Sequence, residues 1–123
     1  MKIRILDDAV RLRLDRNEVD AIGRGESVEA STHFVDAQVF SYCLCVSNVA
    51  TVESTFRDNR LTVILPVGIA SRWANDATAV SITGEHGPTS LLVEKDFECL
   101  DPRAGEDQGN RFRNPNADYG ASQ

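Results

Sequence analysis

The first and second halves of this chain repeat one pattern at a spacing of 51 residues. In each half, a strand of alternating apolar and polar residues leads into a short helical pattern and then into another strand. The apolar strand positions correspond in pairs: Val10 to Leu61, Leu12 to Val63 and Leu14 to Leu65. The closing strands, which contain Val28 and Ile82, require a further shift of one residue. Such repetition indicates a duplicated structural unit, with pseudo-repeats at about residues 2–47 and 52–97.

Period-two alternation of apolar residues predicts strands along most of the chain. We expect them at residues 2–6, 9–14, 27–34, 38–47, 52–56, 60–65, 79–83 and 90–95. The strand at 38–47 is apolar or small on both of its faces, so we expect both faces to be buried. The fold class predicted is α+β: a β-rich duplicated barrel of two strand-strand-helix-strand-strand pseudo-repeats, with two short helices and a C-terminal extension.

Each half contains one predicted helix. Asp15 followed by Glu18 is a capping-box sequence, and Gly23 and Gly25 end the helix that it begins. Pro66 begins the second helix, where a missing backbone amide costs nothing. The inner face of the second helix should carry three apolar residues: Ile69, Ala70 and Trp73.

The length of 123 residues favours one domain, which we place at residues 1–100. Apolar residues nearly vanish after Asp101, while proline, glycine and asparagine accumulate. Residues 101–123 are therefore predicted to be a flexible or loosely docked tail, with Phe112 and Tyr119 as its only large anchors.

Composition restricts the compartment and the partners of the chain. No apolar run approaches the ~18 residues that a membrane helix needs, and acidic residues follow Met1 too soon for a signal peptide. We therefore expect a cytoplasmic protein of bacterial style that has no membrane partner. A net charge of −6 opposes binding to nucleic acid, because phosphate contacts depend on Lys and Arg. The three cysteines are an odd number, which predicts free thiols.

Arginines recur on the predicted strands and define one alternative site. A nucleic-acid-binding face would use the two arginine sets of the pseudo-repeats: Arg4, Arg11 and Arg13 with Arg57 and Arg60. The competing interpretation places these side chains on the solvent face of ordinary alternating strands.

Thiols and imidazoles define a second alternative. Cys43 and Cys45 project from one face of a strand, and together with His33 they are the candidate ligands of a zinc or copper site. His86 and Cys99 are the remaining soft donors. Because no paired ligand motif follows downstream, core thiols are the competing interpretation, and no metal is assigned.

Charged residues gather at the end of the last strand, where they could handle protons or protect a sheet edge. They are Glu94, Lys95, Asp96, Asp101 and Arg103. The chain contains none of the familiar nucleophile, phosphate-loop, dinucleotide or metalloprotease motifs. We therefore expect no enzymatic activity, no catalytic residue and no cofactor.

The stretch from Asn59 to Lys95 is similar to the AbrB and MazE class of swapped-hairpin β-barrels. The resemblance lies in a strand, Leu61 to Leu65, that enters a proline-started helix, and in the closing strands at 80–82 and 91–95. It implies two interlocking copies, which here would lie in one chain, as in cradle-loop barrels. It also implies a nucleic-acid-binding regulator as an alternative function.

The whole chain more closely resembles a family of short bacterial proteins of unknown function. The shared segments are Arg11 to Leu14, Glu18 to Asp20, Asp58 to Arg60 and Val93 to Leu100. This resemblance implies no activity. The leading hypothesis is a small non-enzymatic binding module for a protein partner, or a homodimer through an exposed sheet edge; the alternatives are the nucleic-acid regulator and a metal or small-ligand protein.

Overall fold

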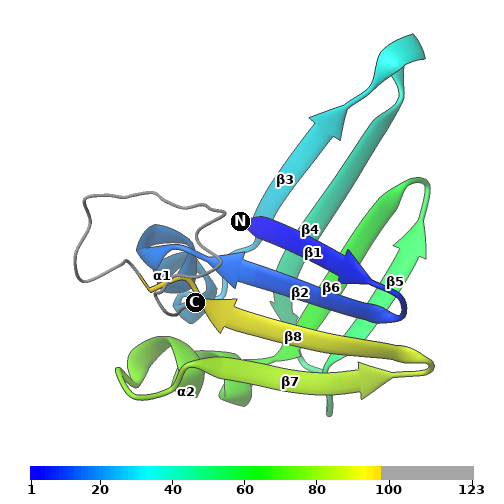
Figure 1. Ribbon diagram of the computed structural model, residues 1–123. Helices are drawn as coiled ribbons and strands as arrows, with labels where there is room; N and C mark the ends of the chain where they lie inside the picture. The colour runs from blue at the N-terminus through cyan, green and yellow to red at the C-terminus, as the bar shows by residue number, and fades with distance from the viewer. Residues whose placement is uncertain (98–123) are drawn as a thin grey trace, which may run out of the picture.

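The computed structural model describes residues 1–97, so the predicted tail at 101–123 lies outside the described residues. Strands alternate with two short helices in the order predicted (Figure 1). The elements are β1 (Lys2–Leu6), β2 (Ala9–Leu14), α1 (Arg16–Gly23), β3 (Val28–His33), the 3-10 turn η1 (Val35–Ala37), β4 (Val39–Ser47), β5 (Glu53–Arg57), β6 (Arg60–Pro66), α2 (Val67–Asn75), β7 (Ser81–His86) and β8 (Thr89–Lys95). The connection between the strands predicted at 79–83 and 90–95 is shorter than expected, because β7 continues to His86 and a tight turn at Gly87, with φ of 61°, follows directly.

The strands form two four-stranded sheets, which we call sheet A (β1-β2-β8-β7) and sheet B (β3-β4-β6-β5). The central pair of each sheet is parallel and the outer pairs are antiparallel. Each pseudo-repeat contributes one hairpin to each sheet, and exchanging the repeats converts sheet A into sheet B. The α+β class and the duplication are therefore confirmed.

Strand pairing gives the true correspondence between the halves. Leu12 pairs with Val93 in sheet A, and the equivalent Val63 pairs with Leu44 in sheet B. Val28 pairs with Leu44 and Ile82 pairs with Val93, so Val28 and Ile82 are equivalent although they lie 54 residues apart. The closing strands are thus shifted by three residues from the spacing of 51, and the predicted shift of one residue is wrong. The segment that contains the helix is three residues longer in the second half.

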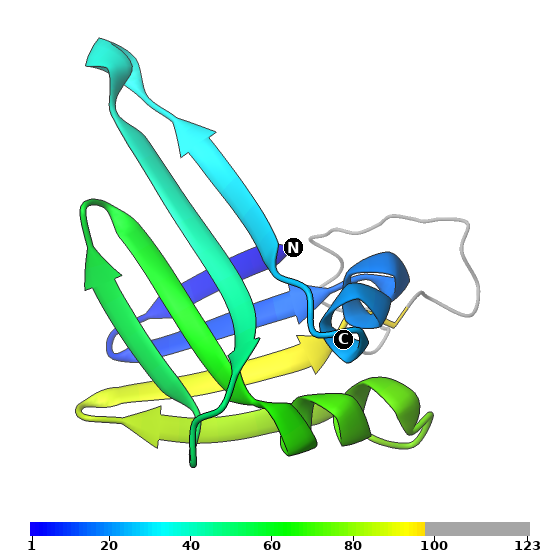
Figure 2. The same cartoon turned by 180° about the vertical axis from the view of Figure 1, so that it is seen from behind.

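Both helices begin as the sequence predicts. The Glu18 backbone amide donates to Asp15 Oδ1 at 2.9 Å, and the Asp15 amide donates to Glu18 Oε1 at 3.0 Å, which completes the capping box. Pro66 lies immediately before α2 as its N-cap. The two helices pack side by side at one end of the sheets (Figure 2). Gly23 permits this approach, because a Cβ at that position would lie 2.8 Å from Cβ of Ala74.

One apolar core joins the two sheets and the helices. Its most deeply buried strand residues include the four repeat-related positions, Leu12, Leu14, Val63 and Leu65, none more than 1% exposed. Trp73 is 2% exposed, as predicted, and its Nε1 donates to the Val80 carbonyl at 3.0 Å. Ile69 is 37% exposed, so its predicted place on the inner face of α2 is wrong. The fully buried residues of this short helix are Ala70 and Trp73, and Ala74 packs half-buried against the core.

The sheets meet near the helices and diverge toward the hairpin turns (Figures 1 and 2). Within residues 1–97, no strand pairing joins sheet A to sheet B. The molecule therefore has the predicted duplicated, barrel-like arrangement, but the barrel is not closed. β4 is buried on both faces only at its centre: Tyr42 and Leu44 lie in the core, and Cys43 is buried on the opposite face. Cys45 is half-buried, and Val39 and Ser47 at the two ends of the strand are exposed.

Candidate functional site

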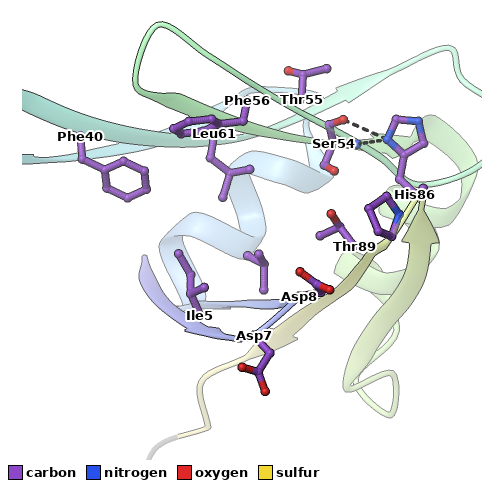
Figure 3. Close-up of a pocket in the computed structure, with 13 residues that line it drawn as sticks. Ile5, Asp7, Asp8, Phe40, Ser54, Thr55, Phe56, Leu61, His86 and Thr89 are labelled. Atoms are coloured by element: carbon purple, nitrogen blue, oxygen red, sulfur yellow. Dashed lines mark hydrogen bonds between the residues drawn. The ribbon is translucent and has the colours of Figure 1, made fainter.

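A hollow of about 610 Å³ lies where the two sheets diverge, and we call it the cleft (Figure 3). Both sheets and two hairpin turns contribute to its walls. The lining residues are Ile5, Asp7, Asp8, Val10, Phe40, Ser54, Thr55, Phe56, Leu61, His86, Gly87, Pro88 and Thr89. Most come from the inward-facing positions of strands whose helix-proximal ends are buried in the core.

The cleft walls are mainly apolar and are open to solvent. Ile5 is 57% exposed on β1 and Phe56 is 63% exposed on β5, although both occupy positions that alternate with outward-facing residues. The Phe40 ring lies between Tyr42, with ring centroids 5.8 Å apart, and Phe56, at 6.5 Å. Ile5 and Phe56 remain exposed because the two sheets have diverged at this distance from the helices. Exposed apolar surface of this kind in a concave site is typical of a binding surface.

The turn between β1 and β2 gives the cleft an acidic margin. Asp7 adopts a left-handed backbone with φ of 51°, which Asp tolerates better than most residues. In Figure 3, the Asp8 carboxylate lies on the side of the turn near Thr89, whereas the Asp7 carboxylate points away from the hollow. Neither carboxylate forms an ion pair with another residue of the described chain. Asp8 is therefore an uncompensated negative charge beside an apolar wall.

His86 joins the two sheets at the opposite margin of the cleft. Its Nδ1 lies 3.0 Å from the Ser54 amide nitrogen and 2.9 Å from the Ser54 carbonyl oxygen (Figure 3). Unprotonated Nδ1 accepts from the amide, and protonated Nδ1 donates to the carbonyl. Nearby, a Cβ on Gly84 would lie 2.8 Å from Cβ of Val52, so β7 approaches the start of β5 closely. We call this junction the β5–β7 seam.

The five predicted arginines do not form one face. Arg4, Arg11 and Arg13 project from the outer face of sheet A, whereas Arg57 and Arg60 belong to sheet B. Glu94 Oε2 lies 2.9 Å from the Arg13 Nη2 and 3.5 Å from the Arg11 Nε.

The Arg60 guanidinium forms an ion pair with Glu29 on the outer face of sheet B. Three of the five arginines thus have a carboxylate partner: Arg11 and Arg13 share Glu94, and Arg60 pairs with Glu29.

The soft donors are spread along sheet B. Cys43 and Cys45 are free thiols on the outer side of β4, while His33 lies at the far end of β3, opposite Val39. Burial raises the pKa of both thiols, and the Arg60 charge only partly opposes this for Cys43. Within residues 1–97, no group of three or more His, Cys, Asp or Glu side chains is arranged to hold a metal ion. Cys99 lies outside the described residues.

The charged residues at the end of β8 have separate partners. Glu94 binds the arginines of β2, and Asp96 Oδ2 lies 2.9 Å from Lys2 Nζ. Lys95 Nζ donates to the Asp76 carbonyl at 3.0 Å and lies 5.6 Å from the centre of the Trp73 ring. Asp101 and Arg103 fall outside the described residues. The three described residues therefore tie β8 to different parts of the structure.

Sequence reasoning missed the cleft. It assigned Phe40 and Phe56 to ordinary strands, and the pattern of a half-buried strand is the same for a closed barrel and an open one. A usable signal was present in β5, where Phe56 is the one large apolar residue of the five from Glu53 to Arg57 and is separated from the turn at Asp58 by Arg57 alone. An apolar residue at a strand tip is poorly placed for a central core.

Comparison with known proteins identifies the family of the chain and nothing more. No helix in the described part of the structure has the length and apolarity needed to span a membrane. No curated protein matches the chain, and no solved structure matches it. The model of a family of unknown function, DUF7009, matches residues 1–116, as the whole-chain resemblance predicts. This chain therefore belongs to that family of unknown function.

Proposed function

We propose that this protein is a small non-enzymatic interaction module whose cleft binds an extended segment of a partner protein. The segment would carry apolar side chains beside a lysine or arginine. The observation that supports the proposal is the open apolar cleft with Asp8 at its margin. Ile5 and Phe56 expose more than half of their surface there, and exposed apolar surface of this kind is typical of a site that a partner covers.

Charge favours a cationic partner. The whole chain carries a net charge of −6, and Asp8 has no ion-pair partner in residues 1–97. A lysine or arginine that follows an apolar residue would reach the Asp8 carboxylate while its neighbour packs on Phe40 and Phe56. Surface pairs of this kind contribute about 0.2–1 kcal/mol each, so the apolar contact supplies most of the affinity and the carboxylate supplies selectivity.

Two matched synthetic peptides test this proposal. One alternates leucine and phenylalanine with lysine, and the other replaces each lysine with glutamate. Binding is measured by fluorescence anisotropy of labelled peptides. We expect saturable binding of the lysine peptide and binding of the glutamate peptide that is about tenfold weaker or more, since each opposed charge changes the affinity severalfold.

Variants then locate the binding to the cleft. Asp8→Asn should weaken the lysine peptide by about two- to fivefold. The turn should tolerate Asn, because Asn59 occupies the equivalent position between β5 and β6. Asp58→Asn in that second turn lies outside the cleft and serves as the matched control. Equal binding of both peptides, or saturable binding of neither, would contradict the proposal.

Apolar variants provide a larger effect. Phe56→Ser should abolish peptide binding while leaving the fold intact, because the Phe56 side chain is already 63% exposed. Phe34→Ser is the matched control: Phe34 is 58% exposed and does not line the cleft. Loss of binding in both variants would place the contact elsewhere than in the cleft.

A further inference from the structure

The outer face of sheet A is positively charged on an otherwise acidic protein. Strand alternation places four cations and two carboxylates on this face: Lys2, Arg4, Arg11 and Arg13, with Glu85 and Glu94. A third carboxylate, Asp96, pairs with Lys2 just beyond the end of β8, so the face carries an excess of one positive charge. The net charge of the complete chain is −6. A cationic sheet face on such a chain concentrates its attraction for anions in one place.

A hollow of about 700 Å³ lies on this face, separate from the cleft. Small residues, Ala9 and Ser90, occupy neighbouring positions on β2 and β8 and leave space above them. Arg4, Leu6, Arg11 and Leu92 surround that space, with Glu85 on β7 at the other side. The lining therefore combines two guanidinium groups with leucine side chains.

The pseudo-symmetry explains why the hollow is empty of side chains. Ala9 corresponds to Arg60 in sheet B, and Thr83 corresponds to Glu29. In sheet B, the Arg60–Glu29 ion pair crosses β4 and contributes to the burial of Cys43, which is 6% exposed. In sheet A, alanine and threonine are too short to span β8. The position of Leu92, equivalent to Cys43, is consequently left at the edge of an open space.

Two arginines meet at this hollow, and together with Arg13 they outnumber the carboxylates Glu85 and Glu94. Arg4 on β1 lies directly opposite Arg11 on β2, and like charges at such positions repel each other. Glu94 bonds to Arg13 at 2.9 Å and lies 3.5 Å from Arg11, while Arg4 has no ion pair with any residue in 1–97. An added anion between the two guanidinium groups would replace this repulsion with two charge-assisted contacts.

We propose that this hollow is a second ligand site, which binds a small amphipathic carboxylate. The carboxylate of the ligand would bind Arg4 and Arg11, and its apolar body would lie on Leu6, Ala9 and Leu92. Glu85, on the far strand of the sheet, directs the charged end of the ligand toward Arg4. This site differs from the cleft in its charge preference and in the sheet face that it uses, so the two proposals stand independently.

Three probes with one chain length separate charge from hydrophobicity: octanoate, octanol and octylammonium. Binding is followed by chemical-shift titration of the full chain. We expect saturable octanoate binding with shifts at Ala9, Ser90 and Leu92, and octanol binding that is weaker by about tenfold or more. Arg4→Gln with Arg11→Gln should lower octanoate affinity to that of octanol, while Arg57→Gln on sheet B should leave it unchanged.

A second variant, which fills the hollow with side chains, tests binding independently of any folding defect in the arginine variant. Ala9→Arg with Thr83→Glu copies the Arg60–Glu29 arrangement of sheet B into sheet A and should abolish octanoate binding with the melting temperature retained. Equal affinities for octanoate and octanol would overturn the proposal, and so would octanoate binding that survives both variants. A lack of saturable octanoate binding up to about 10 mM would also overturn it, because two charge-assisted contacts should give measurable affinity at that concentration. Shifts confined to Ile5 and Phe56 would assign the probes to the cleft and likewise overturn it.

Discussion

The two junctions between the sheets are related by pseudo-symmetry but are built differently. At the β5–β7 seam, Gly84 packs against Val52 and His86 contacts the Ser54 backbone. At the corresponding junction between β1 and β3, which we call the β1–β3 seam, the equivalent pairs are Ala30 with Met1 and Thr32 with Ile3. The β5–β7 seam is thus tied near the β7–β8 turn, whereas the β3–β4 hairpin projects away from sheet A (Figures 1 and 2).

On the other side, the residue that precedes β1 is tied to β4 and α1, at the helix end of the sheets. The Tyr42 hydroxyl donates to the Met1 carbonyl at 2.9 Å, and the Met1 ammonium lies 2.6 Å from Glu18 Oε2. A duplicated chain has therefore diverged at a few positions so that the sheets are held together close to the helices on one side and further out on the other. This difference leaves the cleft open without separating the shared core.

The largest expected effect comes from Trp73, which anchors the segment that leads into the β5–β7 seam. Trp73→Ala removes a buried ring and its hydrogen bond to Val80, and should lower the free energy of unfolding by about 3–5 kcal/mol. Phe34→Ala, at the exposed hairpin tip, should change it by less than about 0.5 kcal/mol. Urea unfolding of both variants gives the two values. Similar values for both would show that Trp73 does not anchor the seam.

A smaller effect should follow from adding one methyl group inside the seam. Gly84→Ala places a Cβ 2.8 Å from Cβ of Val52, and overpacking of this kind costs about 1–3 kcal/mol. Gly68→Ala on α2 is the matched control, because nothing lies within 4 Å of its added Cβ. Thermal unfolding should show a lower melting temperature for the first variant and an equal or higher one for the second. A Gly84→Ala protein as stable as its parent would mean that the seam is loosely packed.

His86 should contribute the smallest effect on stability but a clear local one. His86→Ala removes the contact with Ser54 and should cost about 0.5–1.5 kcal/mol. Thr32, at the equivalent position of the β1–β3 seam, has no such contact in the described structure. Thr32→Ala should therefore lower the free energy of unfolding by less than His86→Ala does. Hydrogen exchange at the Ser54 amide should accelerate in the first variant only. Unchanged exchange would remove His86 from the account of the seam.

Much of the fold could be predicted from sequence, because its determinants are local. The strand periodicity, the Asp15–Glu18 capping box and the proline start of α2 all reappear in the structure. Repetition at 51 residues also indicated the duplication. The register of the closing strands could not be predicted, because the three extra residues of the second half lie in a helix and its connection, where periodicity does not fix a count.

The candidate sites were far less predictable. Whether Ile5 and Phe56 are buried depends on the distance between two sheets, and no local pattern encodes that distance. The sequence placed Arg4 and Arg11 on strands, but only the pairing of β1 with β2 shows that they face each other. Likewise, the ion pair of Arg60 with Glu29 joins residues 31 positions apart through two strand pairings.

The central claim is that the open cleft, and not another surface, binds an apolar segment next to a cation. Methyl-resolved chemical-shift mapping of the full chain with the lysine peptide tests this most directly. We predict shifts concentrated on Ile5, Val10 and Leu61, which line the cleft, and little change at Val67 and Ile69, which are exposed on α2. Shifts concentrated on α2 or on the outer face of either sheet, with the cleft methyl groups unchanged, would contradict the account.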